Sequence, residues 1–271
     1  MKLIVAALVP LLALDVTQAQ NLVKNGDFET VINPQTGTAI AENGNYFVRT
    51  GQGNNQDLYG VDLAGWSNNS TFGIVYGAGI GDDPSFMHYE YNDLNYKGAY
   101  YLMGPRNGHA NGMPDSSPTG GNYFGTDSNY YQGPLSQTVQ GLVTGQSYTL
   151  SFYWAAAVIS TGAGNGQTSG WNVSLAGAAG TDATTSVISP SYDRYDFVPW
   201  QQSVVNFVAN SSTETLTFTP TGTGSPPMSL LDGVAIYAGT NVTAVPEPQT
   251  LALWLGGLGV LALLRRRRSA T

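Results

Sequence analysis

The sequence predicts an all-β sandwich, with a signal segment before it and a short apolar segment after it. Two observations favour this class: short segments alternate apolar and polar residues between turn-rich stretches, and no convincing helical period interrupts them. Glycine accounts for 34 of the 271 residues. So many glycines disfavour long amphipathic helices, and antiparallel strands are therefore expected to form the body.

The first expected element is a signal peptide at residues 1–19. Lys2 precedes an apolar run at Leu3–Leu14, and Thr17–Ala19 form a small-residue cleavage site. The run is too short to span a membrane as a helix. A buried N-terminal strand is the alternative interpretation.

The body expected to fold comprises residues 21–240, and it is acidic. From Asn21 to Val245 the chain has five basic and sixteen acidic residues, which gives a net charge of −11. An acidic surface repels phosphate backbones, so nucleic acid is excluded as a partner. There is no cysteine, although an exported protein could form disulfides. Stability must then come from a hydrophobic core or from a bound metal.

The clearest strand is expected at Ser147–Ala155. Its alternation places one set of side chains toward the core, namely Tyr148, Leu150, Phe152 and Trp154. Further strands are predicted at Leu135–Val139, Trp171–Leu175, Gln201–Ala209, Thr215–Thr219 and Leu230–Tyr237. The threonines at positions 215, 217 and 219 are expected to form an ordinary solvent-facing row, and binding to ice or another flat surface is the alternative that a single threonine-lined strand does not support.

Glycine-, asparagine- and proline-rich stretches in the first half predict long loops. They lie at Gly51–Asn55, Gly77–Asp83 and Gly104–Gly121. Because function concentrates in loops that a rigid scaffold holds, these stretches are one candidate binding surface.

The C-terminal tail, residues 244–271, has three parts in order. The first part is the motif Val245, Pro246, Glu247 and Pro248. The second part is the apolar segment Leu251–Leu264, and the third is the basic cluster Arg265, Arg266, Arg267 and Arg268. Fourteen helical residues reach only ~21 Å, against a hydrocarbon core of ~30 Å, so the predicted transmembrane helix at 249–264 is short. The arginines keep their end in the cytoplasm, which places the body outside.

This tail resembles the PEP-CTERM sorting signal of Gram-negative bacteria. The resemblance implies an exosortase as processing partner and an anchor that is only transient. The expected location is therefore the membrane at first, and then the cell surface or the extracellular space. An ordinary tail anchor with an accidental Pro-Glu-Pro is the alternative.

A second resemblance runs through the body. Asn21–Glu29, Gly65-Trp66, Leu135–Val139, Trp200 and Leu231–Val234 stand in the order seen in galactose-binding-like jelly rolls, which include many carbohydrate-binding modules. The resemblance implies a jelly-roll β-sandwich. It also implies a structural Ca²⁺ held by Glu29 and Asp232, with Asp27 as a possible third ligand. The alternative is that Asp27 and Asp232 bond to nearby backbone at turns or strand ends.

A carbohydrate platform is the second candidate site. Sugars bind to aromatic faces, with polar groups fixing their hydroxyls. The predicted residues are Tyr123, Tyr130 and Tyr131 in one loop and Tyr192, Arg194 and Tyr195 in another. The alternative is that these tyrosines only cover contacts between loops and sheet.

No residue pattern argues for catalysis. The two histidines, His88 and His109, fit no metal-ligand spacing, and cysteine nucleophiles are ruled out. The predicted function is a non-catalytic exported protein that associates with the cell surface or with extracellular polysaccharide in the exopolysaccharide matrix. A carbohydrate-binding module with a defined sugar site and a secreted polysaccharide hydrolase are the alternatives.

Overall fold

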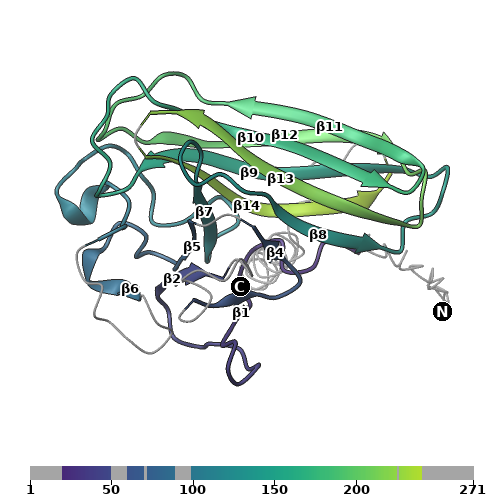
Figure 1. The fold of residues 1–271 in the computed structure, drawn as a ribbon, viewed down its shortest axis with the longest axis horizontal. Coiled ribbons are helices and arrows are strands. Elements are labelled where there is room, and N and C mark those ends of the chain that lie inside the picture. Colours follow the sequence, from purple (N-terminus) through teal and green to yellow (C-terminus); the bar gives the residue numbers. More distant parts are fainter. Residues whose placement is uncertain (1–19, 50–59, 70–71, 89–98, 225, 240–271) are drawn as a thin grey trace, which may run out of the picture.

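The computed structural model describes residues 20–49, 60–69, 72–88, 99–224 and 226–239. These residues form a β-sandwich, as predicted (Figure 1). The predicted signal peptide, the loop at Gly51–Asn55 and the C-terminal tail lie outside the described residues. In the part of the chain that is described, no helix has the length and apolar character needed to cross a membrane.

Two sheets form the sandwich. The five-stranded sheet has the order β11 (Gly180–Ile188), β10 (Thr168–Gly177), β13 (Thr213–Thr223), β8 (Leu135–Gln140) and β4 (Ser67–Asn68). The seven-stranded sheet has the order β12 (Val198–Val208), β9 (Ser147–Val158), β14 (Pro227–Ala238), β7 (Tyr123–Asp127), β5 (Gly73–Tyr76), β2 (Asn45–Val48) and β6 (Met87–His88). A small ribbon pairs β1 (Val31–Ile32) with β3 (Asp62–Leu63), and two short 3₁₀ helices are η1 (Pro84–Phe86) and η2 (Pro105–Asn107).

Strands β7 to β14 have the topology of an eight-stranded jelly roll. The order β7-β14-β9-β12 in one sheet faces β8-β13-β10-β11 in the other, and most consecutive strands alternate between the two sheets. Only the β10–β11 hairpin stays within one sheet. The jelly-roll prediction is therefore confirmed by the strand order itself.

The main core lies between the sheets and contains the predicted face of β9. Tyr148, Leu150, Phe152 and Trp154 are all buried there. Phe152 meets Phe218 from the opposite sheet edge to face, with ring centroids 5.1 Å apart. Such aromatic pairs add about 0.5–1.5 kcal/mol to the free energy gained from burying their area.

A second hydrophobic layer covers the outer face of the seven-stranded sheet. Residues 77–88 and 99–122, which we call the cover segments, contribute Met87, Leu102 and Met113 to it. These side chains pack on Tyr123 and Ala155 of the sheet. The predicted loops at Gly77–Asp83 and Gly104–Gly121 thus contain no β-strand, and they close one face of the sheet.

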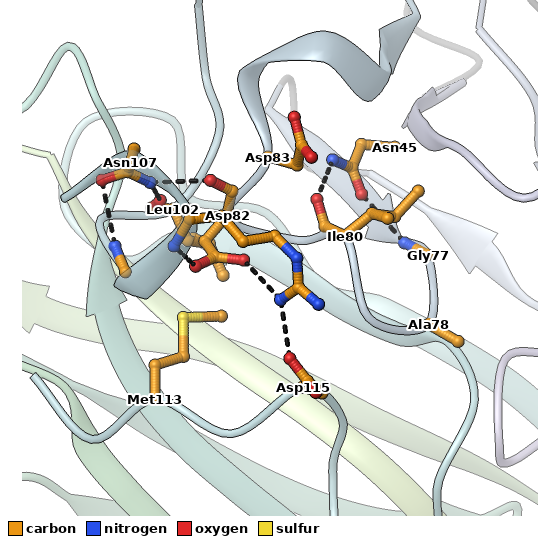
Figure 2. A network of polar contacts seen from close by, with 12 residues as sticks. Asn45, Gly77, Ala78, Ile80, Asp82, Asp83, Leu102, Asn107, Met113 and Asp115 are labelled. Atoms are coloured by element: carbon orange, nitrogen blue, oxygen red, sulfur yellow. Dashed lines mark hydrogen bonds and ion pairs between the residues drawn. The ribbon is translucent and has the colours of Figure 1, made fainter. Parts of the chain in front are cut away.

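A polar network ties the cover segments to one another (Figure 2). Arg106 Nη1 donates to Asp115 Oδ1 at 2.6 Å and to Asp82 Oδ1 at 3.3 Å. Asn107 Nδ2 donates to the carbonyls of Asp82, at 2.7 Å, and Leu102, at 2.8 Å. The hydrogen bond to Asp115 is the main reason that the pKa of Arg106 is raised. The cover segments are therefore held by specific polar contacts as well as by apolar packing.

Candidate functional site

The jelly-roll register gathers several connections at one end of the sandwich. Asp127 pairs with Met228 and Val158 pairs with Pro227, so the turn after β7 lies beside the turn after β9. Val198 pairs with Ala156, which brings the start of β12 to the same end. We call this end, with residues 128–134, 159–167 and 189–197, the loop end.

Three of the predicted sugar-contacting tyrosines are exposed at the loop end. The exposed fractions are 60% for Tyr130, 55% for Tyr131 and 45% for Tyr195. The buried Asp127 shapes the first loop, because its Oδ1 accepts the backbone N–H groups of Asn129 (2.8 Å) and Tyr130 (3.0 Å). Burial raises the pKa of Asp127, and these two N–H groups counteract the rise. The carboxylate thus turns the chain so that the next two rings face outward.

A series of contacts leads from Tyr131 to Arg194. The Tyr131 ring stacks on Phe72 with centroids 6.2 Å apart, and Phe72 meets Tyr100 at 5.3 Å. Tyr100 N–H donates to Ser160 Oγ at 2.9 Å, and Arg194 Nη2 donates to the Ser160 carbonyl at 3.3 Å. The two predicted tyrosine groups therefore belong to one connected region.

Arg194 and His109 complete this region around Tyr195. The Arg194 guanidinium carbon lies 5.2 Å from the centroid of the Tyr195 ring. His109 stacks on the same ring at 4.2 Å, with an interplanar angle of 11°. Neither Phe72 nor His109 was expected in the site, because their partners are distant in the sequence. We call Phe72, His109, Tyr130, Tyr131, Arg194 and Tyr195 the aromatic surface.

The prediction was wrong for Tyr123 and Tyr192 as sugar contacts, because both are buried. Tyr123 is 1% exposed and lies in β7, where its ring stacks on Tyr76 under the cover segments. Tyr192 is 5% exposed, and its hydroxyl donates to the Ala157 carbonyl at 3.1 Å. Burial raises the pKa of both phenols. Neither ring can stack on a ligand without unpacking the protein.

Asp232 forms the centre of a separate acidic region. It follows the core residue Leu231 in β14, so strand alternation turns its side chain to the outer face, where the side chains of Ser117 and Thr119 cover it. Both hydroxyls donate to Oδ2, whereas Oδ1 is buried without a hydrogen-bond partner. Burial raises the pKa of Asp232 to about 7, and the two hydroxyls counteract the rise.

The same short segment also contacts Glu29. The backbone N–H of Asn122 donates to Glu29 Oε1 at 2.6 Å. Gly121 has φ +66°, and a Cβ there would lie 1.5 Å from Glu29 Oε1, so the close approach requires glycine. Burial raises the pKa of Glu29, and Asp27 raises the pKa values of both Glu29 and Asp232. We call Asp27, Glu29, Asp232 and residues 117–122 the acidic corner.

The acidic corner contains oxygen atoms of the kind that hard cations bind, but its carboxylates alone do not form a ligand set. In the described ranges, no three histidine, cysteine, aspartate or glutamate side chains are grouped as metal ligands. The unpartnered Oδ1 of Asp232 is the observation in favour, since a buried carboxylate oxygen without a partner is costly. Hydroxyl and backbone oxygens of 117–122 would have to supply the remaining ligands.

A cavity of about 360 Å³ opens beside the acidic corner. Asp27, Thr119 and Gly233 line it together with Asn21 and Tyr237. The Asn21 amide is already used, because its Oδ1 accepts the N–H groups of Val23 and Ile236. The cavity therefore offers the Asp27 carboxylate and the Tyr237 ring as its distinctive groups.

The comparisons with known proteins identify the tail. Residues 244–268 match the PEP-CTERM protein-sorting motif, so the chain carries this signal. The motif indicates export and sorting to the cell envelope or surface. No curated protein matches the chain in sequence.

Solved structures similar to the body include carbohydrate-binding modules. TmCBM61 in complex with β-1,4-galactotriose has a TM-score of 0.36 and 11% identity, covering 82% of this chain and 100% of that one. A CBM4 structure has a TM-score of 0.36 and 16% identity, covering 80% and 99%. The N-terminal cellulose-binding domain of Cellulomonas fimi β-1,4-glucanase C has a TM-score of 0.31 and 16% sequence identity, and the match covers 49% of this chain and 94% of that one. These scores are too low to assign a ligand or a site to this chain.

Proposed function

We propose that this chain is an exported, non-catalytic protein that binds extracellular polysaccharide through the aromatic surface. The observation that carries the proposal is the exposure of Tyr130, Tyr131 and Tyr195 on neighbouring loops. An exposed ring can stack on the apolar C–H face of a pyranose, while a guanidinium or amide fixes its hydroxyls. Arg194, whose guanidinium lies over the Tyr195 ring, supplies such a group.

The position of the rings also supports binding rather than packing. Among the residues that the structure describes, Tyr130 is the most exposed of the large apolar and aromatic side chains at 60%, and Asp127 holds its loop in place. A preorganised loop loses little conformational entropy when it binds, which favours affinity. Association with the exopolysaccharide matrix after sorting is part of the same proposal.

Affinity electrophoresis in gels containing extracellular polysaccharide, together with a glycan array, tests the proposal. The protein should be retarded by at least one polysaccharide, and the Tyr131→Ala variant should be retarded less. Val143→Ala, which alters an exposed side chain 57% accessible and outside the loop end, is the matched control. If the protein bound no glycan on the array and had the same mobility in every gel, with or without polysaccharide, sugar binding would be rejected.

A polysaccharide hydrolase is the competing function. Hydrolysis needs two carboxyl groups flanking the scissile bond, and the carboxylates of the aromatic surface's loops bond to backbone N–H groups. Asp127 accepts from Asn129 and Tyr130, and Asp193 accepts from Gly166 at 3.0 Å. We therefore expect no release of reducing sugar from any polysaccharide that binds, and steady release would favour the hydrolase.

We further propose that the acidic corner holds a structural Ca²⁺. Asp232 and Glu29 would bind it, aided by oxygens of residues 117–122 and by Asp27. The ion would supply positive charge to partly buried carboxylates and would fasten the chain start to the last strand and the cover segment. Its removal by a chelator should lower the melting temperature, and an unchanged melting curve would reject it.

For the tail, we propose processing by an exosortase at the PEP-CTERM motif after transient anchoring. Pro246→Ala or Glu247→Ala should leave the full-length protein in the membrane fraction, while Thr250→Ala, a nearby change outside the Pro-Glu-Pro tripeptide, should not. Normal release of both motif variants would contradict motif-directed processing.

A further inference from the structure

Asparagine is followed by glycine at five places in the chain, and all five lie within the described residues. Glycine has no Cβ, so its backbone nitrogen can approach and attack the side-chain amide of the preceding asparagine. This attack begins deamidation, a covalent change that needs no enzyme. The five asparagines have the same following residue but different surroundings; they are Asn25, Asn43, Asn107, Asn111 and Asn165.

Four of these side chains are held by hydrogen bonds from Nδ2 to backbone carbonyls. Asn111 Nδ2, for example, donates to the carbonyls of Met103, at 2.8 Å, and Tyr195, at 2.9 Å. Nδ2 is the group that leaves in deamidation, and these bonds also fix the side chain away from other orientations. Deamidation at these sites must therefore first break hydrogen bonds of the fold; the other three are Asn25, Asn43 and Asn107.

Asn165, in the loop end, has the opposite arrangement. It is exposed, and its Nδ2 makes no hydrogen bond to the part of the chain that the structure describes. Its Oδ1 accepts the backbone N–H of Arg194 at 3.3 Å. This hydrogen bond stabilises the negative charge that develops on Oδ1 when a nucleophile attacks Cγ. The amide is thus polarised at its oxygen, and its leaving group is free.

The nucleophile, the backbone nitrogen of Gly166, is bonded to a carboxylate. Its N–H donates to Asp193 Oδ1 at 3.0 Å. A β-bridge fixes this pairing, because Gln167 and Tyr192 exchange two backbone hydrogen bonds of 2.8 and 2.9 Å next to it. A backbone amide must lose its proton to attack, and a carboxylate that already accepts this hydrogen bond is placed to take the proton.

We propose that Asn165 is a site of spontaneous deamidation, with Asp193 as the general base. The Gly166 nitrogen attacks Asn165 Cγ and gives its proton to Asp193. The bond from Cγ to Nδ2 breaks, and Nδ2 leaves as ammonia with the proton that Asp193 returns. The product is a cyclic succinimide. Water then opens the ring at either carbonyl, which gives aspartate or isoaspartate.

The modification changes the aromatic surface, and this consequence rests on the proposed function. It creates a negative charge next to Arg194, whose guanidinium lies over the Tyr195 ring. Arg194 Nε is buried without a hydrogen-bond partner among the described residues, so the guanidinium has an unused donor. A guanidinium that pairs with a carboxylate is less available to sugar hydroxyls. Polysaccharide binding should therefore weaken as the exported protein ages.

Peptide mapping by mass spectrometry tests the proposal on the full chain in detergent micelles, aged in warm, mildly alkaline buffer. Each deamidation adds about 1 Da, and the aspartate and isoaspartate peptides elute separately. The Asn165 site should react at least about tenfold faster than the other four sites. The matched control is the same chain in urea, where all five sites are unfolded and should react at similar rates. Equal rates in the folded protein, or the same preference in urea, would overturn the proposal.

Two variants test the role of the base. Asp193→Asn keeps an acceptor for the Gly166 N–H but removes the base, so it should slow the reaction at Asn165 about tenfold. Asp27→Asn changes an exposed acid outside the loop end and should leave that rate unchanged. Melting curves confirm that both variants fold. Equal rates in Asp193→Asn and wild type would overturn the assignment of Asp193.

The effect on binding is measured with the same aged samples. Polysaccharide affinity of wild type should fall about two- to tenfold on ageing, as it should in fresh Asn165→Asp, whereas Asn165→Gln, which closes a cyclic imide far less readily, should keep its affinity. Unchanged affinity in fully deamidated wild type would overturn the effect on binding. If fresh wild type bound no polysaccharide, the proposed function would fail, while the mass measurement would still decide whether Asn165 deamidates.

Discussion

The outer layer of the seven-stranded sheet and the loop end both contain tyrosines, yet they use them in opposite ways. Tyr123 is 1% exposed and stacks on Tyr76 beneath the cover segments, whereas Tyr130, only seven residues later, is 60% exposed. The strand β7 ends between them at Asp127. The strand register and the point where the strand ends therefore decide whether a tyrosine is buried in the fold or exposed to solvent.

The largest expected effect separates these two roles. Tyr123→Ala should lower the free energy of unfolding by about 3–5 kcal/mol, because it leaves a large cavity in the outer layer. Tyr130→Ala should change it by no more than about 0.5 kcal/mol, as for other exposed positions. Urea unfolding measures both values. Similar losses in the two variants would mean that the loop end is packed as tightly as the outer layer.

The next largest effect is the gain in stability expected from a calcium ion bound at the acidic corner. At a calcium concentration of about 100 times the dissociation constant, binding adds ~2.7 kcal/mol, or about 5–10 °C in Tm. A chelator should remove this gain, and Asp232→Asn should make Tm insensitive to calcium. Asp193→Asn, which changes an acid at the loop end, is the control. A calcium response that survives in Asp232→Asn would place the ion elsewhere.

The chelated protein should also become less stable as the pH rises from about 4 to about 7. The pKa of Asp232 is raised to about 7 in the fold, so the folded state holds a proton that the unfolded state releases near 3.8. Stability is then full below the unfolded pKa and falls as pH rises toward 7, by at most about 1.4 kcal/mol per pH unit. Calcium should flatten this slope, because it favours the ionised carboxylate.

The contribution of Glu214 to the pH dependence of stability must be separated from that of Asp232 in this experiment. Burial, followed by its hydrogen bond and charge interaction with Asp182, raises the pKa of Glu214 to about 7, so it contributes a slope of the same sign. Glu214→Gln should remove the contribution of Glu214 to the pH dependence of stability at all calcium concentrations. Asp232→Asn should remove the part of the pH dependence that calcium suppresses. If calcium still flattened the remaining slope of Asp232→Asn, the acidic corner would not be its site.

The smallest expected effects are on ligand affinity at the loop end. Removing one ring by Tyr130→Ala, Tyr131→Ala or Tyr195→Ala should cost about 0.5–1.5 kcal/mol, which is about two- to tenfold in Kd. Isothermal titration with a polysaccharide fragment measures this loss. Unchanged affinity in all three single variants would mean that the rings contact no sugar.

Periodicity within one strand was predictable, and contacts between distant strands were not. The alternation in Ser147–Ala155 correctly placed Phe152 and Trp154 in the core. The segment around Tyr123 is glycine- and asparagine-rich, which suggests a loop, but cross-strand pairing with β14 makes it β7. Local sequence carries no information about that pairing.

The candidate sites show the same limit. The sequence supplied Glu29 and Asp232 through a resemblance, but not Ser117, which bonds to Asp232 across 115 residues. It placed three threonines of β13 on the solvent side, but not their pairing with residues of β8 and β10. The exposure of Tyr130, Tyr131 and Tyr195 was predictable, since they lie in polar loops, whereas the burial of Tyr123 and Tyr192 was not.

The most direct measurement compares polysaccharide binding by wild type and by the triple variant Tyr130→Ala, Tyr131→Ala, Tyr195→Ala. We predict that the triple variant melts within a few degrees of wild type and binds its polysaccharide at least about tenfold more weakly. Full binding by a folded triple variant would contradict the assignment of the loop end as the ligand-binding surface.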